Sequence, residues 1–69
     1  MSADNYLLIR EQTDGTFKTY MMSASGDETQ ELGQPIFISP TLRQALQDAQ
    51  KFMSENIVEY GYTIQLQEP

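Results

Sequence analysis

The stretch P35-I-F-I-S-P-T-L-R-Q-A-L-Q-D-A-Q-K-F-M53 combines a short β-forming run with an amphipathic helix, and the fold class follows from that combination. Ser39 is a good N-cap and Pro40 is favoured as the first helical residue, so we expect the helix to begin there. Asn56 is the expected stop, since Asn tolerates the left-handed conformation at a helix end. Apolar residues at spacings of three and four form one stripe: Leu42, Ala45, Leu46, Ala49, Phe52 and Met53.

Two further β-forming runs precede this stretch, at residues 6–10 and 17–22. Between them, Asp14-Gly15 suits a two-residue hairpin turn, whose central positions both need positive φ. This turn would place Glu11 opposite Lys18 as a cross-strand pair of opposite charges. The same register would gather Leu7, Ile9, Tyr20 and Met22 on one face of the hairpin, and Tyr6, Leu8, Phe17 and Met21 on the other.

The segment after the helix alternates regularly, with Tyr60, Tyr62, Ile64 and Leu66 pointing one way. Such alternation is typical of a strand with one buried and one solvent face, so we expect both tyrosines in the core beneath the helix. The predicted fold is a single α+β domain over residues 1–69, in the order β-β-β-α-β. It has an antiparallel hairpin and a mixed sheet with one helix packed on one face. The order of the strands within the sheet stays open.

One helix can cover only one face of this sheet, and the uncovered face would hold Tyr6, Leu8, Phe17 and Met21. Burial of such side chains contributes roughly 1.5–3 kcal/mol each, which is large for a core built from 69 residues. We therefore predict a homodimer, formed through this candidate dimer face or through an exposed sheet edge. The alternative is that the four are apolar residues of an ordinary surface.

The composition excludes several classes of function. The chain contains no cysteine and no histidine, which excludes disulfides, thiol chemistry and an imidazole base. Its four basic residues, Arg10, Lys18, Arg43 and Lys51, are scattered singly within a net charge of −6. Direct binding to nucleic acid, which needs a basic face, is therefore not expected. No catalytic serine arrangement or phosphate-binding glycine motif is present, so we predict a protein that is not an enzyme and has no cofactor.

Cellular location follows from two further patterns. The first five residues carry no basic region or apolar core typical of a signal peptide. No apolar run approaches the 18 residues that a membrane span requires. We therefore expect a cytoplasmic protein without membrane contact.

Residues 23–34 form a long acidic connection that carries Asp27, Glu28 and Glu31. Their spacing does not match a calcium-binding loop, which alternates its oxygen ligands and closes with a glutamate at the twelfth position. Two interpretations stay open. The three carboxylates are either a solvated loop or the surface that contacts a basic protein partner.

A Tyr-bearing first strand, the turn Asp14-Gly-Thr-Phe17 and the helix sequence Thr41-x-x-x-Ala45-Leu46-x-x-Ala49 resemble the small domain of HicB-type antitoxins. The resemblance implies a basic, RNA-cleaving protein as the partner to be neutralised. The Pro-Asp-x-x-Gly-Cys segment that this family has after its second strand is absent here. The likeness therefore serves as an analogy of topology.

Two hypotheses about function remain. The first is a small acidic, non-catalytic protein-interaction module that forms a homodimer. The second is an acidic inhibitor or nucleic-acid mimic, of the kind found in phage and mobile elements or among antitoxins, that blocks a basic partner. Mimicry requires the acidic residues to gather on one face, whereas a general interaction module would have them scattered.

Overall fold

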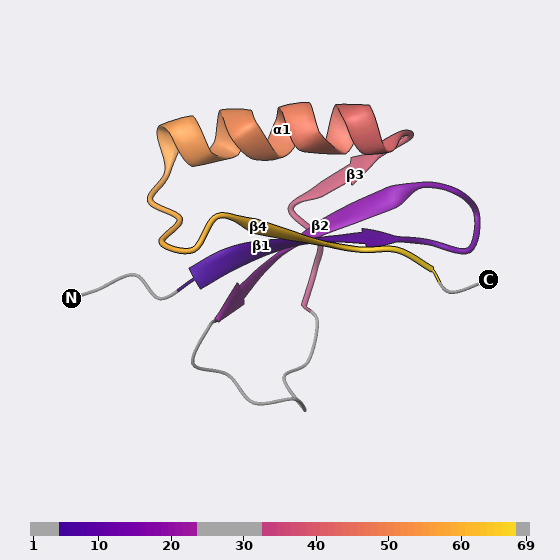
Figure 1. Cartoon of the computed structure of the whole chain (residues 1–69), viewed down its shortest axis with the longest axis horizontal. Helices are drawn as coiled ribbons and strands as arrows, with labels where there is room; N and C mark the ends of the chain where they lie inside the picture. The colour runs from indigo at the N-terminus through magenta and orange to yellow at the C-terminus, as the bar shows by residue number, and fades with distance from the viewer. Residues whose placement is uncertain (1–4, 24–32, 68–69) are drawn as a thin grey trace.

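The computed structural model describes residues 5–23 and 33–67, which form a four-stranded mixed sheet with one helix on one face (Figure 1). This confirms the α+β fold and its β-β-β-α-β order. The sheet has the strand order β3-β2-β1-β4, in which only β1 and β4 pair in parallel. The elements are β1 (Asn5–Glu11), β2 (Phe17–Ser23), β3 (Phe37–Ser39), α1 (Leu42–Glu55) and β4 (Tyr62–Gln65).

The core lies between α1 and the two central strands. Leu7 and Ile9 of β1 are fully buried beneath Ala45 and Ala49 of the helix, and Phe17 of β2 joins them. The two alanines have small side chains, so the helix backbone can lie close to the sheet. Partly buried side chains surround this centre: Leu42, Leu46, Phe52, Met53 and Val58. The apolar stripe read from the sequence therefore faces the sheet.

The hairpin turn has three residues, not the two that the sequence predicted. Gln12 N–H donates to the Thr16 carbonyl at 2.8 Å, and Gly15 N–H donates to the Gln12 carbonyl at 3.1 Å. Gly15 has a φ of +87°, the left-handed conformation that follows the turn in a three-residue loop. Both the backbone N–H and the hydroxyl of Thr16 donate to Asp14 Oδ1, at 2.9 and 2.6 Å. These two bonds lower the pKa of the Asp14 carboxyl below its ordinary value.

The longer turn shifts the register of the hairpin by one residue. Glu11 lies opposite Phe17, and Lys18 lies opposite Arg10, so the predicted Glu11–Lys18 pair is wrong. A slip of one residue moves every side chain of β2 to the other face of the sheet. Tyr20 and Met22, which were expected on the helix side, therefore lie on the opposite side of the sheet. Phe17 and Met21, which were expected on the uncovered side, lie on the helix side.

The predicted dimer face is consequently not one surface. Phe17 and Met21 share the helix side of the sheet, since they lie opposite Glu11 and Leu7. Tyr6 and Leu8 point to the opposite side, where their neighbours are Met22 and Tyr20. Phe17 is only 7% exposed and belongs to the core.

Helix α1 begins at Leu42, later than predicted, and its N-cap is Thr41 in place of Ser39. The Thr41 hydroxyl accepts a hydrogen bond from Gln44 N–H at 3.1 Å, as an N-cap side chain does. Ser39 instead ends β3, where its buried hydroxyl donates to Asp48 Oδ2 at 2.9 Å. At the other end Asn56 closes the helix as expected, but in extended backbone rather than the left-handed conformation.

The expectation that Tyr60 and Tyr62 lie in the core is also wrong. Tyr62 lies opposite Leu7 and Ile64 opposite Ile9, so β4 does turn these side chains to the helix side. The backbone of the helix, however, lies closest to β2 and β3 and is not close to β4. All four apolar side chains of this segment are therefore exposed: Tyr60, Tyr62, Ile64 and Leu66.

Thr19 provides a test of the packing between β2 and the helix. Its side chain is fully buried opposite Ile9, and its hydroxyl has no hydrogen-bond partner within the described residues. A buried hydroxyl without a partner costs about 1–3 kcal/mol. We therefore expect Thr19→Val to raise the free energy of unfolding by about 1 kcal/mol in urea denaturation.

The exposed Thr63 of β4 gives the control for this substitution. Thr63→Val removes a solvated hydroxyl and should change stability by less than about 0.5 kcal/mol. A loss of stability in Thr19→Val would show that the Thr19 hydroxyl is hydrogen-bonded in the folded protein.

Candidate functional site

Two surfaces of the sheet carry exposed apolar side chains in the described part of the chain. The first is the β4 strip, which we define as Tyr62, Ile64 and Leu66 on the helix side of the sheet. The second is the far face, the side of the sheet opposite α1 (Figure 1). Strand pairing assigns to the far face Tyr6, Leu8 and Arg10 of β1, Lys18, Tyr20 and Met22 of β2, Ile38 of β3, and Thr63 and Gln65 of β4.

The far face is mostly apolar in its middle. Tyr20 and Met22 are buried there, and Leu8, which lies opposite Tyr20, is half-buried. Ile38 of the edge strand β3 is 64% exposed. No helix or strand among the described residues covers this side of the sheet (Figure 1). Ile38 is therefore the well-exposed apolar side chain of the far face, whereas Tyr20 and Met22 are nearly inaccessible to solvent.

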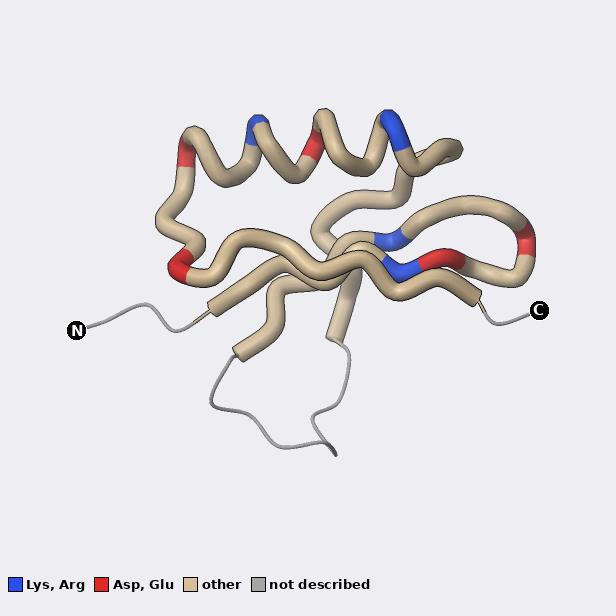
Figure 2. Tube along the Cα trace, in the orientation of Figure 1, with Lys and Arg blue, Asp and Glu red and all other residues tan. Residues whose placement is uncertain are grey.

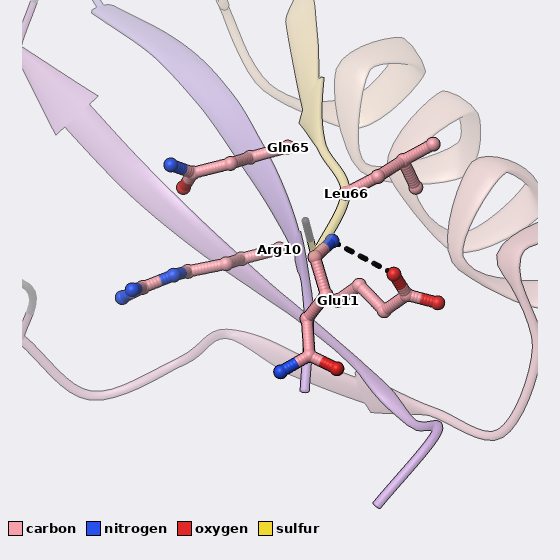
Figure 3. Close-up of a pocket in the computed structure, with 5 residues that line it drawn as sticks. Arg10, Glu11, Gln65 and Leu66 are labelled. Atoms are coloured by element: carbon pink, nitrogen blue, oxygen red, sulfur yellow. Dashed lines mark hydrogen bonds between the residues drawn. The ribbon is translucent and has the colours of Figure 1, made fainter. Parts of the chain in front are cut away.

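A row of polar side chains crosses the far face at its hairpin end. Lys18 lies opposite Arg10 on one side and Ile38 on the other, and Arg10 lies opposite Gln65. Figure 3 shows the Arg10 and Gln65 side chains extending in the same direction, while Leu66 points to the helix side. No ion pair joins any two described residues, so Arg10 and Lys18 are adjacent cations, of which Lys18 has a longer-range electrostatic attraction to the exposed Asp14.

Acidic residues occupy other positions in the described structure. Figure 2 shows acidic and basic residues alternating along α1, in the order Arg43, Asp48, Lys51 and Glu55. Asp48 is held by Ser39 and by Gln44 Nε2, at 2.9 and 3.0 Å, and so ties the helix to β3. The remaining described carboxylates are those of Glu11, Asp14 and Glu59, and none of them is at a far-face strand position.

An open depression of about 310 Å³ lies beside the ends of β1 and β4. It is lined by Arg10, Glu11, Gln65, Leu66 and Gln67. Gln67 N–H donates to Glu11 Oε1 at 2.8 Å, which uses that carboxylate to hold the chain after β4 (Figure 3). Glu11 and Arg10 belong to opposite faces of the sheet, so the polar groups of the depression do not converge on one point.

The acidic loop residues proposed from the sequence, Asp27, Glu28 and Glu31, lie outside the described residues. Within residues 5–23 and 33–67, no group of three acidic residues is placed to hold a metal ion. No helix in the same ranges is long and apolar enough to cross a membrane.

The cationic row was missed in the sequence because the hairpin register was wrong by one residue. That register gave Lys18 a carboxylate partner, Glu11, and left Arg10 opposite Thr19. The signal that could have corrected it is Gly15, which fits the third position of the loop Thr13-Asp14-Gly15 as well as the second position of a two-residue turn.

Comparison with known proteins gives no match: no family model, no curated protein and no solved structure matches this chain. The resemblance to HicB-type antitoxins accordingly receives no support. The β4 strip and the far face are therefore the candidate functional surfaces of the described residues.

Proposed function

We propose that this protein is a small, non-catalytic protein-interaction module that acts as a homodimer. One observation carries the proposal: the β4 strip is exposed beside the helix, and Ile38 is exposed on the far face. Apolar side chains on a sheet this small gain most when a second protein surface covers them. The depression beside the ends of β1 and β4 is open, and its polar groups do not converge as those of a substrate site do.

Nucleic-acid mimicry receives less support from the charges. A mimic needs closely spaced carboxylates on one face, whereas the acidic residues of α1 alternate with Arg43 and Lys51 (Figure 2). The far face carries Arg10 and Lys18 and no described carboxylate. The described charges therefore favour the interaction module.

The outer edge of β4 is the surface through which we expect the dimer to form. Leu7 N–H donates to the Gly61 carbonyl. The backbone N–H and C=O groups of every second residue from Gly61, namely Gly61, Thr63 and Gln65, therefore face β1. The backbone groups of Tyr62 and Ile64 consequently point away from the sheet. Strand edges are usually protected by proline, charge or short length, and the four residues of β4 include neither proline nor a charged residue.

The other edge of the sheet is better protected. Strand β3 has only three residues and lies between Pro35 and Pro40, which have no backbone N–H to donate. A second chain would find few free donors there. This difference directs the proposed contact to β4.

An antiparallel pairing of β4 with β4 of a second copy satisfies two-fold symmetry. With Thr63 opposite itself, Tyr62 of one copy lies opposite Ile64 of the other, an aromatic and β-branched cross-strand pair. Both helices then lie on the same side of one continuous sheet, and the two β4 strips meet. A stable interface needs about 800 Å² from each copy, about a sixth of the 5033 Å² that the chain exposes. This requirement makes the strip, and not the backbone edge alone, part of the proposed interface.

Sedimentation equilibrium of the wild-type chain and of Ile64→Lys tests the dimer. The wild type should sediment as a dimer, and Ile64→Lys should be a monomer at the same concentration, because a charge would enter the centre of the interface. Ile57→Lys is the matched control, since Ile57 is 77% exposed and outside β4. A wild-type monomer at high concentration would refute the homodimer, and equal dissociation of both variants would place the interface elsewhere.

A further inference from the structure

We propose that the far face binds a protein segment in which an acidic side chain lies beside apolar ones, with Arg10 and Lys18 holding the carboxylate. The inference rests on the interaction role proposed above and names the chemistry of the partner. It is independent of the β4 dimer, because edge pairing at β4 does not involve Arg10 and Lys18, which lie on β1 and β2.

The first argument is an unfavourable contact within the sheet. Like charges directly opposite each other on neighbouring strands destabilise a sheet. Arg10 and Lys18 occupy such a pair; no ion pair within the described residues joins either of them to a carboxylate, and the attraction of Lys18 to the exposed Asp14 acts at longer range. Local conflicts that a fold retains without compensation are expected at functional sites. An anion bound between the two cations would turn this repulsion into attraction.

The second argument is the chemistry of the neighbouring groups. An arginine guanidinium binds a carboxylate through two parallel hydrogen bonds, and a lysine ammonium adds a compact charge. Gln65 extends beside Arg10 and offers an amide that can donate to the same ligand (Figure 3). Ile38 next to Lys18, and Leu8 in the following row, provide apolar contacts. The far face therefore combines a carboxylate site with an adjoining apolar surface.

The third argument concerns which anion fits. Proteins that bind nucleic acid through its backbone use many phosphate contacts, on the order of 6–10, whereas the far face has two cations. The chain carries a net charge of −6, which repels a polyanion or an anionic membrane at long range. A single carboxylate flanked by apolar side chains requires only short-range contacts. The two cations of the far face and the negative net charge of the chain therefore favour an acidic protein segment over a nucleic acid or a membrane.

A peptide titration followed by NMR tests this proposal. The probe is a short synthetic peptide of alternating valine and threonine with one central glutamate, added to the ¹⁵N-labelled protein. The amide signals of Lys18, Arg10 and Gln65 should shift on binding. The same peptide with glutamine in place of glutamate should bind about tenfold more weakly, about 1.4 kcal/mol, because it lacks the charge that strengthens the hydrogen bonds.

Substitutions on the protein provide the matched comparison. Arg10→Gln and Lys18→Gln should each weaken binding of the glutamate peptide about tenfold. Arg43→Gln and Lys51→Gln remove the same charge from exposed positions of α1 and should leave binding within about twofold. An equal loss in the helix variants would overturn the proposal, because net charge alone would then explain the effect.

The remaining outcomes separate this inference from the proposed function. If both peptides shift the far-face amides with equal affinity, the interaction surface stands and the carboxylate site is wrong. If neither peptide shifts them, both the carboxylate site and the role of the far face in binding are wrong. Stronger binding of an oligonucleotide or of anionic vesicles at the same amides would overturn the choice of a protein partner.

Discussion

Phe17→Ala is expected to lower the free energy of unfolding by about 3–5 kcal/mol, the usual cost of truncating a buried phenylalanine. Phe17 is 7% exposed and packs with Ile9 under Ala45 in the core. A domain of this size has only a few kcal/mol of stability, so the loss removes most of it. Urea denaturation followed by circular dichroism measures the change.

Met21→Ala is the control, because the sequence-based register placed Met21 and Phe17 on the same uncovered face. Met21 is 38% exposed in the structure, beyond the core cluster. Its truncation should cost about 1 kcal/mol or less. Equally small effects of the two substitutions would contradict the three-residue turn and the register that follows from it.

Ala49→Asp should abolish stable folding at neutral pH. Ala49 is fully buried against the sheet, and a carboxylate there would lose its water without gaining a partner. The penalty for an unpaired buried charge is several kcal/mol, about as large as the whole stability of a small domain. Circular dichroism at neutral pH should show loss of the helix.

The pH dependence of this variant distinguishes the charge from the added volume. Burial raises the pKa of the new carboxyl in the folded state above its unfolded value. The folded state then binds more protons, so stability rises as the pH falls from neutral towards the unfolded-state pKa. Gln50→Asp introduces the same charge at the next, exposed position and should fold normally. Failure of Ala49→Asp to recover at lower pH would assign the defect to overpacking.

The order of elements and the helix could be predicted from the sequence because both depend on local patterns. The apolar spacing from Leu42 to Met53 is helical whatever surrounds it, and the alternation from Tyr60 to Leu66 is that of a strand. These patterns also identify which side chains share a face. They do not show where α1 lies across the sheet, so the exposure of Tyr62 and Ile64 could not be predicted.

The hairpin register failed for a different physical reason. Asp14-Gly15 is compatible with a two-residue and a three-residue loop, and the choice depends on which residue takes the left-handed conformation. The Glu11–Lys18 pair favoured the shorter loop because it satisfied a charge rule that the folded chain does not obey. The candidate dimer face was derived from this register, so Phe17 and Met21 were assigned to the wrong side of the sheet.

The parallel pairing of β1 with β4 also determines the order in which the sheet can form. Leu7 lies opposite Tyr62, a separation of 55 residues, whereas the β1–β2 hairpin closes over a turn of three. The entropy of closing a loop rises with its length, and contacts distant in sequence slow folding. During synthesis, the hairpin can therefore pair while the edge of β1 that β4 later occupies is still open. Until the last strand arrives, Leu7 and Ile9 lie along a free edge, and in this interval the chain is most prone to aggregate.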